Sequence, residues 1–171
     1  MGAALPRALR ASRSCSAWVH RRLNHSTLVS HRRDPNSITV VPHTRLELPT
    51  SAATAWRLLT DTEAWLQWGP SVRAVDAPAR LIGPGSCGRV QTVMGVWLPF
   101  EITRWRPGRE WAWRVAGIPA TGHIVAPLAP SRCRVTFTIP PWAPFYLPVC
   151  RVALRRLHGL AMKSDEGQQQ R

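Results

Sequence analysis

Few side chains in this sequence have the type and spacing that acid–base chemistry requires. His123 is the only histidine between Val72 and Ile139, where most of the strands are predicted, and a histidine in a cavity can transfer protons near neutral pH. Glu101 is its best acidic partner, because burial among apolar residues would raise its carboxyl pKa. Strand alternation, however, places Glu101 opposite Phe100 and Ile102, in solvent or beside an arginine such as Arg114. We therefore favour structural roles for both catalytic candidates, His123 and Glu101.

A glycine-rich segment and four cysteines are the other features of the sequence that could bind a cofactor or a metal. The segment Gly83–Gly88 (GPGSCG) matches G-x-G-x-x-G, but a strand follows it rather than the helix that binds a pyrophosphate. We interpret it as a hairpin turn. The cysteines at positions 15, 87, 133 and 150 are isolated, with no C-x-x-C or His/Cys cluster. The sequence predicts no metal site and no cofactor, and its spacing contains no Ser-His-Asp or Cys-His constellation.

Composition narrows the class of protein. A chain of 171 residues is long enough for one domain with a real core. It contains nine Trp, one Tyr and three Phe, so indoles are expected to dominate the interior. Half of the net charge of +14 falls on residues 1–45, and the remaining arginines are scattered, which argues against nucleic-acid binding. Because no apolar run reaches the ~18 residues of a membrane span, none is predicted.

The chain is expected to have three parts. Residues 1–37 form a basic flexible leader, which is either a transit-like peptide, a plain basic extension or the product of a start codon assigned too far upstream. Residues 38–163 form the domain, and residues 164–171 form a polar tail that frays. We expect a cytoplasmic protein, or an organellar one if the leader is a transit peptide. The oligomeric state is left open.

Within the domain, periodicity predicts a strand, two short helices, a series of antiparallel strands and a long final helix. Ala52, Ala55, Trp56 and Leu59 share one helical face, and Thr60 with Glu63 resembles a capping box that begins a second helix. Short Gly/Pro-rich turns leave no room for crossover helices between the strands. The strands are predicted at Ser37–Leu48, Val72–Ala77, Arg80–Ile82, Arg89–Met94, Val96–Trp105, Glu110–Ala116, Gly122–Leu128 and Arg132–Ile139, and the last helix at Pro148–Lys163.

This order resembles the START/Bet v 1-like helix-grip superfamily (SRPBCC), in its polyketide cyclase/dehydrase-like branch. The resemblance rests on TAWRLLTDTEAWLQWGP, GPGSCGRV, LPFEITRWRPGREWAWRV, GHIV and RCRVTFTI, and it covers about residues 39–163. It implies an α+β fold in which a curved antiparallel sheet wraps the C-terminal helix around a deep cavity. The same fold hosts carriers, lyases, cyclases and regulators, so it does not decide the activity.

The resemblance implies that the cavity holds a lipid, a polyketide or another hydrophobic small molecule. The strand tryptophans support an aromatic lining, although the same rings could instead fill a solid core. Tyr146 is expected at the cavity mouth, where its hydroxyl could orient a ligand. We expect a non-catalytic binder or carrier, and the alternative is a cyclase, aromatase or dehydratase acting in the same cavity. The predicted ligand-binding residues are Trp97, Phe100, Trp111, Trp113, Phe137 and Tyr146.

Overall fold

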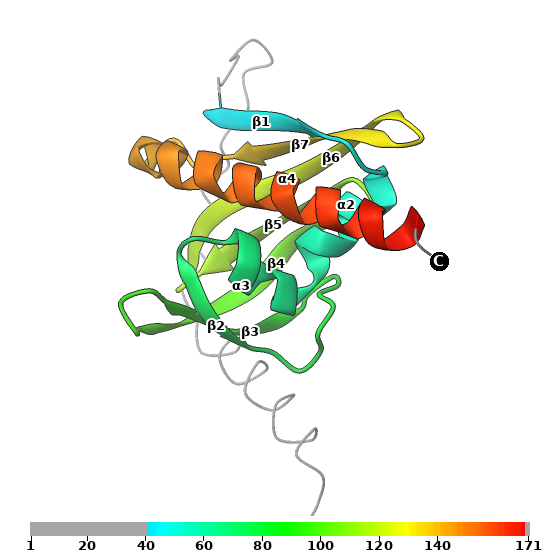
Figure 1. The fold of residues 1–171 in the computed structure, drawn as a ribbon. Helices are drawn as coiled ribbons and strands as arrows, with labels where there is room; N and C mark the ends of the chain where they lie inside the picture. The colour runs from blue at the N-terminus through cyan, green and yellow to red at the C-terminus, as the bar shows by residue number, and fades with distance from the viewer. Residues whose placement is uncertain (1–40, 170–171) are drawn as a thin grey trace, which may run out of the picture. The chain divides into compact units, whose positions relative to one another are not determined.

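The computed structural model describes residues 41–169, so the predicted leader, residues 1–37, lies outside the described residues. Seven strands and three α-helices make up the described part, with one 3-10 turn before the last helix (Figure 1). Their order is β1 (His43–Leu48), α2 (Ala52–Thr60), α3 (Thr62–Trp68), β2 (Val72–Asp76), β3 (Cys87–Thr92), β4 (Trp97–Arg106), β5 (Glu110–Val115), β6 (Ile118–Ala129), β7 (Arg132–Thr138), η1 (Pro144–Tyr146) and α4 (Leu147–Gln169).

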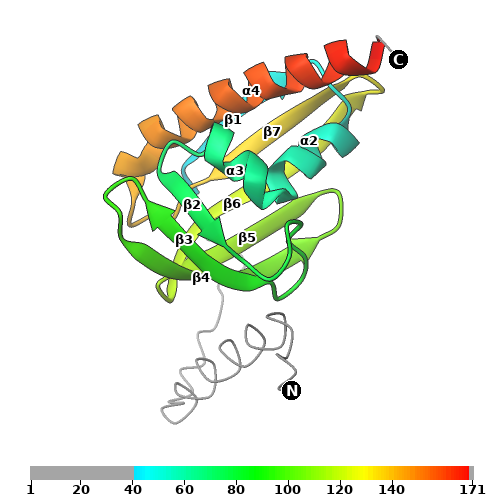
Figure 2. The same ribbon diagram turned by 60° about the horizontal axis from the view of Figure 1, so that its bottom comes forward.

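The strands form one antiparallel sheet in the order β1-β7-β6-β5-β4-β3-β2. The sheet is strongly curved, and α4 runs across its concave side, with α2 and α3 beside it (Figures 1 and 2). Sequential strands pair directly except for β1, which pairs with β7 because the two short helices carry the chain across the sheet. The predicted α+β helix-grip architecture is confirmed.

The core lies between the sheet and the helices. In β7 the side chains of Cys133, Val135 and Phe137 are buried, while the intervening arginines and threonines are partly or fully exposed, as the alternation predicts. On α4, Leu154, Leu157 and neighbouring small residues face the sheet. One continuous cluster of buried apolar side chains therefore joins the helices to the strands.

Two predicted elements differ from the structure. Arg80–Ile82 is not a strand, because it forms only an isolated bridge in which Leu81 pairs with Asp61. The last helix continues to Gln169 rather than ending near Lys163, so most of the predicted polar tail is helical. The buried side chains up to Ala161 already hold α4 against the domain. Adding further turns to an existing helix costs little, so the helix continues without more apolar residues.

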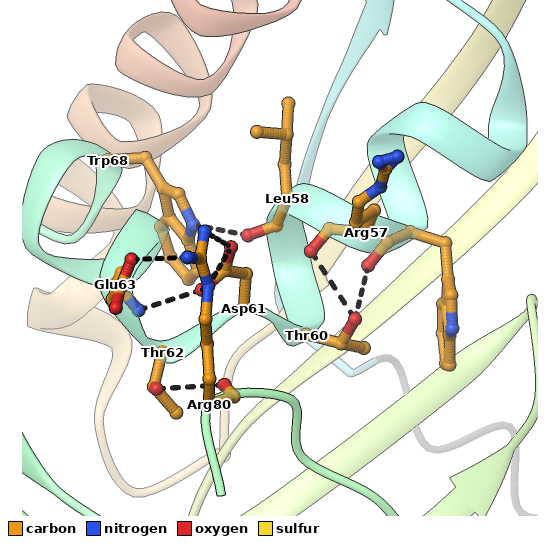
Figure 3. A network of polar contacts seen from close by, with 9 residues as sticks. Arg57, Leu58, Thr60, Asp61, Thr62, Glu63, Trp68 and Arg80 are labelled. Carbon is orange, nitrogen blue, oxygen red and sulfur yellow. Dashed lines mark hydrogen bonds and ion pairs between the residues drawn. The ribbon is translucent and has the colours of Figure 1, made fainter.

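Asp61 joins α2 to α3 without any intervening loop (Figure 3). It is the C-cap of α2 and the N-cap of α3, where its carboxylate accepts a hydrogen bond of 3.0 Å from the Glu63 backbone N–H. Arg80 donates to both carboxylate oxygens, at 3.0 Å from Nε and 2.7 Å from Nη2, and also pairs with Glu63. Burial alone would raise the pKa of Asp61, but these partners outweigh it and the net pKa is lowered.

Candidate ligand-binding pocket

A small pocket opens between the sheet, the C-terminal half of α3 and the first turns of α4. Its volume is about 40 Å³, which is room for one or a few water molecules. Sites for drug-sized ligands measure roughly 300–1,000 Å³. Aromatic side chains therefore fill most of the interior in this conformation. The lining residues are Trp65, Trp68, Gly69, Pro70, Ser71, Val72, Trp111, Trp113, Thr121, His123, Phe137, Tyr146, Val149, Cys150 and Ala153.

Helix α3 supplies one wall through two indoles that are held in place by hydrogen bonds. Trp65 Nε1 donates to the Leu59 carbonyl at 2.8 Å, and Trp68 Nε1 donates to the Leu58 carbonyl at 3.0 Å. Both carbonyls lie in the last turn of α2, where they have free acceptor capacity. Trp65 then stacks on Trp111 of β5, with ring centroids 5.6 Å apart. The α2–α3 corner thus orients the wall against the sheet.

The opposite wall centres on His123 of β6, which is 2% exposed. Its ring stacks on Trp111 at 3.9 Å between centroids and meets the edge of Phe137 at 4.6 Å. Burial lowers the pKa of His123 to about 3, against the smaller, opposing effect of a hydrogen bond with the main chain of Trp111. The imidazole is consequently neutral at physiological pH.

Polar atoms in this wall are incompletely paired. Trp113 Nε1 donates to Thr121 Oγ1 at 3.2 Å, and the Thr121 hydroxyl lies 3.4 Å from His123 Nε2. In contrast, Trp111 Nε1 and His123 Nδ1 are buried without a partner in hydrogen-bonding geometry. Each such atom costs roughly 1–3 kcal/mol of stability unless something satisfies it. Both unsatisfied atoms therefore belong to two stacked rings that line the pocket.

The rim is formed by the turn after α3 and by η1. Tyr146 Oη lies 2.5 Å from Ser71 Oγ, so a hydrogen bond joins the two rim segments. Burial raises the pKa of Tyr146, which the Ser71 bond opposes, and the phenol stays protonated. At Gly69 a Cβ atom would lie 2.7 Å from the Trp65 carbonyl oxygen, so the tight turn from α3 into β2 requires glycine.

Four of the six predicted ligand-binding residues line this pocket: Trp111, Trp113, Phe137 and Tyr146. Phe100 is buried behind them, 5.6 Å from the Trp65 ring. Trp97 lies outside the pocket, 41% exposed, with the Arg89 guanidinium 5.5 Å from its ring centre. Its position follows from strand alternation, because Leu98 and Phe100 on either side of Pro99 face inward and Trp97 therefore faces outward.

The two catalytic candidates are separated. His123 lines the pocket, whereas Glu101 lies on the other face of the sheet, opposite Arg114 in the β4–β5 register. They cannot act as an acid–base pair on one ligand. Thr121 and Cys150 also line the pocket although the sequence did not single them out. The pairing of Thr121 with Trp113 depends on a register shift between β5 and β6 that no local pattern encodes.

Neither a metal centre nor a membrane helix is present in the described part of the chain. Across residues 41–169, no group of three or more His, Cys, Asp or Glu side chains could hold a metal ion. No described helix is long and apolar enough to cross a membrane.

Comparison with known families settles the relationship that the fold suggests. Residues 40–163 match the family described as polyketide cyclase / dehydrase and lipid transport. The chain belongs to this family. The match spans the whole domain from the start of β1 into the last turns of α4, and it confirms the resemblance to the SRPBCC superfamily. The cyclase/dehydrase and lipid transport family includes both binding and catalytic proteins by its own description, so membership leaves the activity of this chain open.

Solved structures with this fold have very different sequences. A hypothetical protein from Helicobacter pylori superposes with a TM-score of 0.59 at 11% identity, covering 70% of this chain and 86% of its own. The protein XoxI from Bacillus cereus superposes with a TM-score of 0.57 at 12% identity, covering 72% and 96%. At such identities the likeness shows the fold alone. No curated protein matches the sequence significantly.

Proposed function

We propose that this family member binds a hydrophobic small molecule that has one hydrogen-bond acceptor, and that it does so without catalysing a reaction. The observation behind this proposal is the pocket wall in which Trp111 and His123 stack, buried, with unpartnered ring nitrogens inside an aromatic lining. The apolar surroundings favour a hydrocarbon body. The unpartnered nitrogens favour a group that satisfies them.

The chemistry of that group follows from the hydrogen-bond chain. The indole of Trp113 donates to Thr121, which leaves the Thr121 hydroxyl proton free to be donated to His123 Nε2. The neutral ring then has its proton on Nδ1. Trp111 Nε1 and His123 Nδ1 are in that case both N–H donors, and both are uncharged. A ketone, ester or similar neutral oxygen complements them, whereas a cationic ligand does not.

Ligand entry requires the pocket to widen, since about 40 Å³ does not admit a lipid. The rim is the place where this is easiest. Tyr146 and Ser71 are joined by one hydrogen bond between two different segments, and both side chains are partly exposed. Parting them separates η1 from the turn after α3 without breaking a strand pair.

The alternative is a cyclase or dehydratase in the same pocket, which the family description keeps open. Among the residues that line the pocket, His123 is the only His, Asp, Glu or Lys. A pKa of about 3 makes it a poor base, because efficient general bases have a pKa near the working pH. Glu101, on the other face, cannot assist it. The binding function is therefore the better supported of the two.

The test uses two pairs of probes matched in shape. Acetophenone and 2-acetylnaphthalene each have a carbonyl, and α-methylstyrene and 2-isopropenylnaphthalene replace it by a methylene group. We expect the probes to change tryptophan emission and to raise the melting temperature by mass action. Each ketone should bind about tenfold more tightly than its hydrocarbon partner, as one hydrogen bond in a desolvated site provides.

Variants assign the effect to the pocket. Trp111→Phe and His123→Leu should remove the preference for the ketone and keep binding of the hydrocarbon. Trp97→Ala, on the outer face, should change neither. If no probe of either size alters the emission or the melting curve, the interior is a filled core and the binding proposal is wrong. If the probes bind but are consumed, and His123→Leu abolishes that turnover, the enzyme alternative is correct.

A further inference from the structure

Six large apolar side chains stand out from two loops of the domain. Met94 is 87% exposed and Phe145 is 73% exposed, which makes them the two most exposed large apolar side chains among the described residues. Their neighbours in the same loops are each more than a third exposed. We call these six residues the apolar end: Val93, Met94, Val96 and Trp97 at the β3–β4 turn, and Trp142 and Phe145 before α4.

The two loops lie at the same end of the sheet, and the pocket rim lies between them. Val72 pairs with Thr92 next to the β3–β4 turn, and its neighbour Ser71 bonds to Tyr146, which follows Phe145. Both views place the β3–β4 turn and the first turn of α4 at one end of the domain (Figures 1 and 2). The exposed apolar side chains therefore flank the pocket rim at Ser71 and Tyr146.

This end is also free of acidic residues in the described chain. The segments 69–75, 90–97 and 139–152 contain Arg73 and Arg151 but no Asp or Glu. Arg73 and Arg151 are exposed, and no ion pair of either is found among the described residues.

We propose that the apolar end binds the surface of a membrane that contains anionic lipids. Exposed Trp, Phe, Met and Val at loop tips insert into the headgroup boundary, and nearby cations attract anionic headgroups. Stable attachment to a membrane generally takes two such signals, and this end has both. A second copy of the chain or another protein could cover the apolar side chains, but neither would explain why the charged residues around them are arginines alone. This surface is independent of whether the pocket binds a ligand.

The test uses the full chain and vesicles sedimented after mixing. One set is pure phosphatidylcholine and the other contains about 30% phosphatidylserine, a composition that gives a negative surface potential. We expect binding to the anionic vesicles that weakens as salt is added. The double variant Met94→Glu/Phe145→Glu should bind at least about tenfold less, because it puts charge where the side chains insert. Met162→Glu is the matched control, since Met162 is 48% exposed near the opposite end of α4.

The outcomes separate the possible occupants. Loss of binding in the double variant with normal binding of Met162→Glu supports the proposal. Circular dichroism and the melting temperature of each variant show whether the fold is intact. The proposal is overturned if wild type ignores anionic vesicles, or if binding is unaffected by the double variant and abolished by salt alone. It is also overturned if wild type is a dimer that the double variant dissociates, because the occupant is then a second copy.

Discussion

Acidification should destabilise this protein through His123, and the structure sets the size of the effect. Burial lowers the pKa of His123 to about 3, from an ordinary value of 6.5 that the unfolded chain regains. Below pH 6.5 the unfolded state therefore binds a proton at His123 that the folded state does not bind, and the free energy of unfolding decreases as the pH falls. Above pH 6.5 the ring is neutral in both states, and the free energy of unfolding keeps its full value. We expect about 2 kcal/mol of it to be lost at pH 5 and about 4 kcal/mol at pH 3.

Urea unfolding at pH 7.5 and pH 5.0, followed by circular dichroism, measures this loss directly. His123→Gln cannot titrate, so its free energy of unfolding should lose the part of the pH dependence that His123 causes, whatever its stability at pH 7.5. His43→Gln serves as the control, because His43 is exposed at the start of β1. If His123→Gln shows the same drop between the two pH values as wild type, the imidazole is not buried in its neutral form and the pocket geometry is wrong.

Three further predictions concern stability and the rim. Trp65→Ala should cost about 3–5 kcal/mol through lost burial and a residual cavity, whereas Trp97→Ala should cost less than about 1 kcal/mol; chemical denaturation compares them. Asp61→Asn should cost about 1–3 kcal/mol at pH 7. That cost should shrink as the pH falls below about 4, where the carboxyl of the unfolded chain binds a proton, and it should disappear only below the lowered pKa of the folded state; an unchanged cost at low pH would contradict the lowered pKa. Tyr146→Phe should cost about 1 kcal/mol and speed uptake of 2-acetylnaphthalene in stopped-flow fluorescence; slower uptake would mean that the rim is not the entrance.

Local patterns were sufficient for most of the architecture. Alternation identified the buried side of β7, and helical spacing found α2, because both follow from which residues must leave water. The same alternation excluded Trp97 from the interior, since Leu98 and Phe100 face inward, so counting it as a ligand-binding residue was inconsistent with the strand itself. The bulge between Ile102 and Arg104 then reverses the phase and allows Trp105 to meet Trp56, with ring centroids 5.1 Å apart.

The candidate site was harder to predict because its key contacts join distant segments. The stacking of His123 on Trp111 requires the register of β5 against β6, and the register shift beside Ala112 is set by tertiary packing. The sequence supplied the aromatic character of the pocket and four of its lining residues. It could not give the volume, because about 40 Å³ remains only after every indole has taken its position.

The absence of a loop between α2 and α3 has a mechanical consequence. Asp61 alone links the two helices, and the Trp65 and Trp68 indoles donate hydrogen bonds to carbonyls of α2. We therefore expect α2 and α3 to move as one unit with the pocket wall. A ligand that displaces either indole therefore also shifts the carboxylate that holds Arg80. Arg80 is 61% exposed, so a spectroscopic reporter attached near it would sense from outside whether the interior is occupied.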